Sequence, residues 1–163
     1  STEDYGKLNL NQSPFNISQT IELHDFTVEQ VQDLAKRHQL SLNHAEVQQL
    51  MDLIGGHPYL VRLAFYHLAA NQNLTLKQLL DYAATDTGIY NQHLQRHLNT
   101  LQQCPNLAIS FKKILTATQP IQLETNQGYQ LSSMGLIKRV GNLSEPRNKL
   151  YCLYFQDRLL IES

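Results

Sequence analysis

The sequence predicts a mainly α-helical chain, in which a bundle of helices is followed by a winged helix that carries a small β-hairpin. Three observations predict this fold class. Apolar residues recur at helical spacing along most of the chain, helix-start signals precede these stretches, and one hairpin signal, Gly141-Asn142, stands near the C-terminus. With 163 residues, 42% of them hydrophobic, the chain can bury a core without disulfides.

Two helices are expected after a linker of residues 1–25, which shows no helical period. Thr27 with Gln30, and Asn43 with Glu46, each have the spacing of a capping box, in which the first residues of a helix satisfy each other's backbone N–H groups. Apolar residues follow both boxes at helical spacing. Gly55-Gly56 is expected to end the second helix, since glycine readily adopts the conformation of a helix C-terminus.

Three further helices complete the predicted bundle, residues 26–103. Pro58 suits the first position of a helix, and the residues from there to Ala70 are apolar almost all round, which predicts a buried helix. Thr75 with Gln78 begins a short helix. A longer helix then carries one stripe of residues: Ile89, His93, Leu94, His97, Leu98 and Leu101.

Composition changes at Cys104. Residues 1–103 hold six basic and ten acidic residues, a net charge of −4, whereas residues 104–163 hold seven and four, a net charge of +3. Residues 104–163 are predicted to form the winged helix. Its expected elements are two helices around residues 107–115 and 126–134, strands at 136–140 and 143–146, and a last helix capped by Asn148.

Several classes of protein are excluded or disfavoured. No run of about 18 apolar residues could span a membrane, and the polar N-terminus is not a signal peptide. Cys104 and Cys152 are expected to be reduced thiols of a cytoplasmic protein. Neither has the surroundings of a nucleophile, and no GxxxxGK[ST] phosphate loop occurs. The chain is therefore not expected to be an enzyme by itself.

The most distinctive segment is Gly55-Gly56-His57-Pro58-Tyr59-Leu60-Val61-Arg62. A helix that ends on glycine and another that starts on proline explain it without a ligand. The same geometry also suits a nucleotide, because a helix N-terminus offers free N–H groups to phosphate and a proline ring can pack on an adenine. Arg62, one turn further on, could then reach a phosphate.

Two other groups of residues have weaker functional interpretations. His93 and His97 stand four apart as two metal ligands would, but no further ligand is evident, so packed imidazoles or a helix surface are favoured and no metal is predicted. A basic group in the predicted wing could contact DNA phosphates, but the helix at residues 126–134 contains no Lys or Arg. The wing residues concerned are Lys138, Arg139, Arg147 and Lys149.

The chain resembles the AAA-like ATPase domains of large cyanobacterial regulatory proteins. The resemblance spans nearly the whole chain and rests on spaced blocks: Ser13-Pro14-Phe15-Asn16, Ile21-Glu22-Leu23, Asp25-Phe26-Thr27, the segment from Gly55 to Ala64, Gly88-Ile89-Tyr90, His93-Leu94, Arg96-His97-Leu98, Ser133-Met134-Gly135-Leu136-Ile137-Lys138, Leu150-Tyr151, Tyr154-Phe155 and Asp157-Arg158-Leu159.

Such domains look like signal-transduction ATPases related to AAA+ and NB-ARC proteins. The resemblance implies a nucleotide-binding core, then a helical lid, then a winged helix. This chain would be the lid (26–103) and winged helix (104–163) without the core. Gly56-His57-Pro58 matches the lid motif that contacts ATP or ADP, and Arg62 is the candidate for a second sensor, although Tyr59 stands where that Arg is common. Residues 104–163 contain no His to match the NB-ARC nucleotide sensor.

The function that the resemblance implies is coupling of nucleotide state to an effector. The expected partners are the missing core, an unknown effector domain or protein, and further copies in a homo-oligomer. A membrane is not expected, and the net charge of −1 argues against DNA. No cofactor is expected in this chain alone. Two alternatives stay open: a DNA-binding winged-helix regulator and a protein-interaction scaffold.

Overall fold

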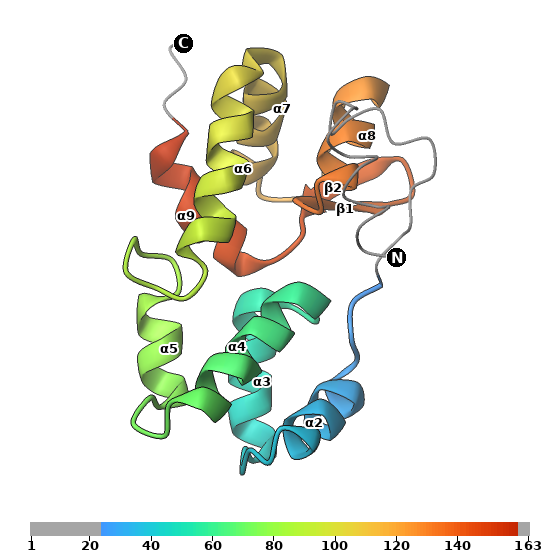
Figure 1. The fold of residues 1–163 in the computed structure, drawn as a ribbon. Helices are drawn as coiled ribbons and strands as arrows, with labels where there is room; N and C mark the ends of the chain where they lie inside the picture. Colours follow the sequence, from blue (N-terminus) through green and yellow to red (C-terminus); the bar gives the residue numbers. More distant parts are fainter. Residues whose placement is uncertain (1–23, 160–163) are drawn as a thin grey trace, which may run out of the picture.

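The computed structural model of the chain describes residues 24–159, and this part is mainly helical as the sequence predicts. Its eight helices and one antiparallel hairpin form two layers, one above the other (Figure 1). The elements are α2 (Val28–Arg37), α3 (His44–Ile54), α4 (Pro58–Ala70), α5 (Leu76–Tyr82), α6 (Asn91–Gln103), α7 (Pro105–Thr116), α8 (Thr125–Ser133), β1 (Ile137–Val140), β2 (Leu143–Pro146) and α9 (Lys149–Arg158). The predicted linker of residues 1–25 lies mostly outside the described residues.

The lower layer in Figure 1 consists of α2 to α5, and its helix starts are those that the sequence predicts. The side chain and backbone of Thr27 and Gln30 bond reciprocally at the start of α2. The same capping box occurs with Asn43 before α3 and with Thr75 before α5. α2 and α5 both pack against α3. Local hydrogen-bond chemistry therefore sets where these helices begin.

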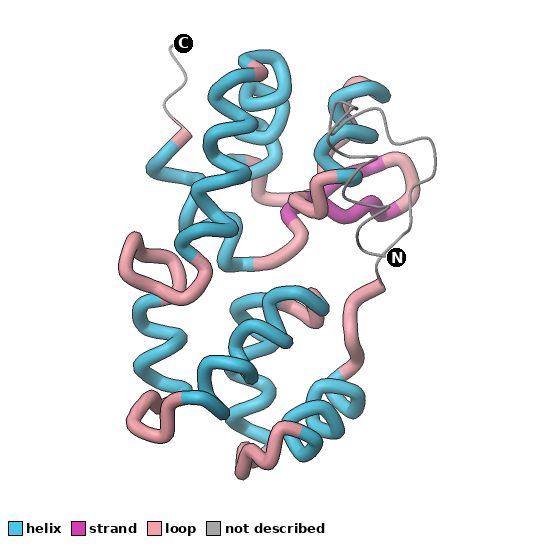
Figure 2. The backbone as a smooth tube through the Cα atoms, viewed as in Figure 1, coloured by secondary structure: helices cyan, strands magenta, loops and turns pink. Residues whose placement is uncertain are grey.

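The upper layer contains α6 to α9 and the hairpin of β1 and β2 (Figure 2). β1 pairs with β2 so that Ile137 faces Pro146 and Val140 faces Leu143. Ile121 adds a bridge to Ser144, so the short break before α8 extends the sheet by one residue pair. α7 packs against α8, β2 and α9.

A single hydrophobic core joins the two layers. α3 of the lower layer packs against α9 of the upper one, and Leu50, Phe65, Leu94 and Tyr151 belong to one continuous buried cluster. α6 packs against α7 and α9, although the sequence groups it with the preceding helices. The predicted division at residue 104 stays a prediction.

The connection between α3 and α4 depends on Gly56. A Cβ at this position would lie 2.0 Å from the carbonyl oxygen of Phe26, and the Phe26 N–H donates to the Gly56 carbonyl oxygen at 2.7 Å. Only a residue without a side chain allows this close backbone approach. Gly56 therefore fixes the segment before α2 against the start of α4.

Membrane-spanning helices are absent from residues 24–159. The longest helices here, α4 and α6, have 13 residues each, whereas a span needs about 20.

Candidate functional site

The loop Gly56-His57-Pro58 lies where the two layers of the molecule meet. Pro58 occupies the first turn of α4, and His57 is its N-cap residue, with only 6% of its surface exposed. His57 makes no side-chain cap hydrogen bond to the helix. Its ring points instead toward residues of α6 and α9, so the loop connects the lower layer to the upper one.

An ion pair stands beside this loop. Arg147, in the turn between β2 and α9, places Nη2 2.8 Å from Oδ1 of Asp25, and its side chain is only 10% exposed. A Cβ built on Gly135 would lie 3.1 Å from Arg147 Nη1 and 3.8 Å from His57 Nε2, so the guanidinium and the imidazole flank the same backbone position. Asp25 precedes α2, and the pair therefore links the segment before the lower layer to the turn after the hairpin.

Three histidines and a tyrosine pack together at this junction. We call His57, His93, His97 and Tyr151 the histidine cluster. The ring centroids of His93 and His97 are 4.7 Å apart, and those of His57 and His93 are 6.2 Å apart. Nε2 of His93 and the hydroxyl of Tyr151 form a buried hydrogen bond of 2.8 Å. His57 directly precedes α4, His93 and His97 are in α6 and Tyr151 is in α9, so the cluster joins the start of α4 to two helices of the upper layer.

All three imidazoles are held in the neutral form. Burial lowers the pKa of His57 to about 4, and the positive charge of Arg147 adds to this effect. Burial also lowers the pKa of His93 to about 3, and the neighbouring His97, His57 and Arg96 lower it further. Burial, with a smaller contribution from Arg96, lowers the pKa of His97 to about 4. A proton on any of these rings would place a charge in a buried site, where desolvation disfavours it.

Two buried polar atoms at the junction lack a hydrogen-bond partner among the described residues. They are Nδ1 of His57 and Nδ2 of Asn148. The other amide atom of Asn148, Oδ1, accepts from the Tyr151 N–H and caps α9. Unsatisfied polar groups in a low-dielectric interior cost free energy, so the junction is not packed for maximal stability.

The other residues predicted to contact a nucleotide are not members of the cluster. Arg62 is exposed on α4, and its guanidinium carbon lies 5.5 Å from the centroid of the Phe26 ring. Pro58 is partly exposed. The loop and Arg62 therefore share the start of α4 but have different surroundings.

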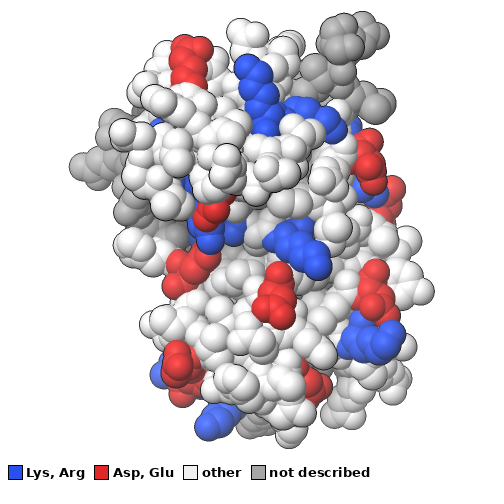
Figure 3. All heavy atoms as spheres, turned by 180° about the vertical axis from the view of Figure 1, so that it is seen from behind, with Lys and Arg blue, Asp and Glu red and all other residues white. Residues whose placement is uncertain are grey.

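The basic residues of the predicted wing do not form one surface. Lys138 pairs with Glu145 at 3.5 Å, and Arg147 is turned inward toward Asp25. The guanidinium of Arg139 lies over α8, 3.0 Å from where a Cβ of Gly128 would stand. Lys149 is exposed at the start of α9. On the face drawn in Figure 3, basic and acidic residues are scattered among uncharged ones.

No group of three or more His, Cys, Asp or Glu side chains within residues 24–159 is arranged to hold a metal ion. His93 and His97 are packed imidazoles, one of the two arrangements that the sequence favours for them. Cys104 and Cys152 are both free thiols.

Asp25, Arg147 and Tyr151 gain their place at the site from the tertiary structure alone. The sequence marks Arg147 as a wing cation. Asp25 is the end of the predicted linker, and both Asp25 and Tyr151 belong to blocks that carry the family resemblance. Among the local sequence features, the four-residue spacing of His93 and His97 points to the histidine cluster, because it puts both rings on one helix face.

Comparison with known proteins gives one match. The model of the AAA-like domain family matches residues 1–157. No curated protein and no solved structure matches the chain. Because the family model covers almost the whole sequence, the chain belongs to the AAA-like domain family.

Proposed function

We propose that this chain is the lid and winged-helix part of a signal-transduction AAA-like ATPase and couples the nucleotide state of that protein to an effector. The family match, the resemblance to cyanobacterial regulatory proteins and the motif Gly56-His57-Pro58 support this proposal. The nucleotide-binding core would precede the chain. The chain itself contains no phosphate loop and would not hydrolyse ATP.

One observation carries the proposal: the predicted nucleotide-contact loop is also the junction between the two layers. His57 is buried against the rings of His93 and Tyr151, while Pro58 is its neighbour in the sequence and is partly exposed. A nucleotide that contacts Pro58 would therefore act one residue away from the histidine cluster. A ligand shifts a conformational equilibrium only through different contacts in the two states, and this position supplies such contacts.

The test uses this chain joined to the core that we propose precedes it. Labels on α4 and α7 would report the distance between the layers with ATP, with ADP and without nucleotide. We expect a nucleotide-dependent distance change that the P58A substitution reduces and that I109A, an exposed residue of α7, leaves intact. A fusion that binds nucleotide without any distance change would favour the scaffold alternative.

The DNA-binding alternative finds little support in the described residues. α8 contains no Lys or Arg, Arg147 is paired inward and Lys138 is paired with Glu145. A gel-shift titration with salt decides the matter, because binding through phosphate contacts weakens steeply as salt rises. Tight binding of this salt-dependent kind would contradict the proposed function.

A further inference from the structure

A pocket of about 460 Å³ lies between α4, the loop before α6 and the first turn of α6. Its volume falls within the range of small-molecule sites, roughly 300–1,000 Å³. Gly56, His57, Pro58 and Arg62 do not line it, so it is separate from the proposed nucleotide contact.

One wall of the pocket is aromatic and aliphatic. Tyr59 is 46% exposed, and the centroid of its ring lies 5.0 Å from that of the His93 ring, with an angle of 34° between the ring planes. Leu63, one turn further along α4, and Ile89, from the loop, also line the pocket. An exposed aromatic face flanked by aliphatic side chains favours a flat, apolar ring.

The pocket lining includes no Asp, Glu, Lys or Arg. It includes two imidazoles, those of His67 and His93, and burial lowers the pKa of His93 to about 3. A charged ligand would lose hydration here without gaining an ion pair. The lining therefore favours an uncharged ligand.

The first turn of α6 supplies hydrogen-bonding groups to the pocket lining. The side-chain amides of Asn91 and Gln92 are in the first turn of α6. The Asn91 N–H donates to the Gly88 carbonyl oxygen, and Tyr90, the N-cap residue of α6, makes no side-chain cap hydrogen bond to the other N–H groups of this turn. Amides and N–H groups pair with a ring that carries its own donors and acceptors, which favours a heteroaromatic ring over a hydrocarbon.

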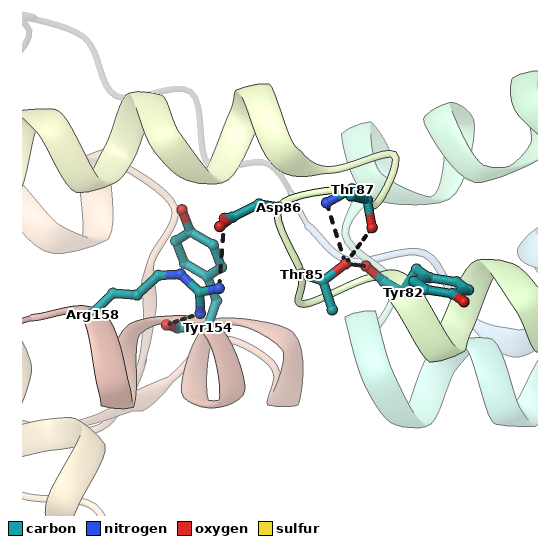
Figure 4. Close-up of polar contacts among 6 residues, drawn as sticks. All are labelled: Tyr82, Thr85, Asp86, Thr87, Tyr154 and Arg158. Atoms are coloured by element: carbon teal, nitrogen blue, oxygen red, sulfur yellow. Dashed lines mark hydrogen bonds and ion pairs between the residues drawn. The ribbon is translucent and has the colours of Figure 1, made fainter.

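The loop that borders the pocket is held in place (Figure 4). The Thr85 hydroxyl donates to the Tyr82 carbonyl at 2.7 Å and lies 3.2 Å from the Thr87 hydroxyl. Asp86 reaches Arg158 of α9 at 3.6 Å, and the Arg158 guanidinium lies 4.1 Å from the Tyr154 ring centroid. These contacts hold the loop in place from its start to Thr87, which reduces the ordering that ligand binding requires.

Gly88 allows this loop to close tightly. A Cβ there would lie 2.1 Å from the Tyr82 carbonyl oxygen. The loop therefore keeps its shape only with glycine at this position.

We propose that this pocket binds an uncharged heteroaromatic ring system of one or two fused rings, stacked on Tyr59 and hydrogen-bonded by the first turn of α6. The proposal does not depend on the proposed function. The pocket shares His93 with the histidine cluster, but the residues proposed to contact the nucleotide do not line it, and its ligand lacks phosphate.

The test titrates the 163-residue chain with adenosine and nicotinamide as neutral probes and with ADP as a charged one, followed by amide NMR spectra. We expect both neutral probes to shift the amide signals of Gly88, Ile89 and Gln92. Y59A should weaken binding at least about tenfold, within the range that one ring stack contributes. Y59F keeps the ring and should restore binding. Y66A is the matched control, because Tyr66 is an exposed tyrosine of α4 that does not line the pocket.

Three outcomes would overturn the proposal. The first is no shift with either neutral probe at millimolar concentration. The second is equal binding by wild type and Y59A. The third is binding of ADP far above that of adenosine together with loss of that binding in P58A, which would assign the contact to the proposed nucleotide loop instead. If the distance between the layers does not change with nucleotide, the proposed function fails, but the titration of the neutral probes still tests the pocket.

Discussion

The guanidinium of Arg147 lies 2.8 Å from the carboxylate of Asp25, although 122 positions separate the two residues in the sequence. This pair joins the segment before α2 to the turn between the hairpin and α9. It lies beside Gly55 and His57, so the junction between the two layers includes both an ion pair and a neutral histidine cluster.

Breaking this ion pair should destabilise the chain. D25N leaves Arg147, only 10% exposed, without its carboxylate, and should lower the free energy of unfolding by about 1–2 kcal/mol. The loss is smaller than for a fully buried pair because 34% of the Asp25 side chain is exposed. The matched control is D33N, since Asp33 and Arg37 form a pair whose side chains are 61% and 75% exposed. Equal losses for D25N and D33N in urea unfolding would contradict the prediction.

Stability should fall as the pH drops below about 6.5. In the unfolded chain, the three cluster histidines take up protons near their ordinary pKa of 6.5, whereas the folded chain keeps His57, His93 and His97 neutral down to about pH 4, 3 and 4. The unfolded state then binds more protons, so the stability is fully present above pH 6.5 and declines toward pH 4. Each histidine contributes up to about 1.4 kcal/mol per pH unit.

Urea unfolding at pH 7.5 and pH 5.5 measures this dependence. H57Q should reduce the loss of stability between the two pH values, because one titrating group is removed. H44Q is the control, since His44 is exposed on α3. A pH dependence that is the same in wild type and H57Q would show that His57 plays no part in it.

Removing the Tyr151 hydroxyl should also destabilise the cluster. Y151F leaves Nε2 of His93 without its partner at 2.8 Å in a buried site, which should cost about 1–3 kcal/mol. Y66F removes a hydroxyl from a side chain that is 63% exposed and should cost almost nothing. Thermal unfolding of the two variants gives the comparison, and a Y151F melting temperature equal to that of wild type would refute the role of this hydrogen bond.

A methyl group at position 56 should disturb the junction more than one in the hairpin turn. G56A would place Cβ 2.0 Å from the Phe26 carbonyl oxygen, so backbone must move, and we expect a loss of about 3 kcal/mol or more. G141A meets no atom within 4 Å, and only its φ of 65° opposes the substitution, for about 1–2 kcal/mol. The prediction fails if G141A proves the more damaging of the two in denaturant unfolding.

The helix starts show how much of the fold can be predicted locally. Thr27, Asn43 and Thr75 cap helices as the sequence predicts, because each capping box is formed within four consecutive residues. The long stripe beginning at Ile89 also predicts a helix, but α6 begins at Asn91, after a turn that ends with the Asn91 N–H donating to the Gly88 carbonyl. The spacing of apolar residues does not distinguish a turn of this kind from the first turn of a helix.

The candidate site is less predictable. The motif from Gly56 to Pro58 is visible in the sequence, but nothing local places His57 against Tyr151 or Arg147 beside Asp25. In the sequence alone, Arg147 is one of the basic residues of the predicted wing that could contact DNA phosphates. Its inward position follows from the packing of the turn before α9 against the loop before α4, where Gly55 and Gly135 leave room for it.

The sequence by itself determined the helices, the hairpin and the motif at the start of α4, because capping, proline and glycine preferences act within a few residues. Only the tertiary structure decided that this motif lies at the junction of two layers, next to three neutral imidazoles and one inward-facing ion pair. Those contacts join residues as far apart as Asp25 and Arg147. The free energy that selects them comes from burying one shared core, which depends on the whole chain at once.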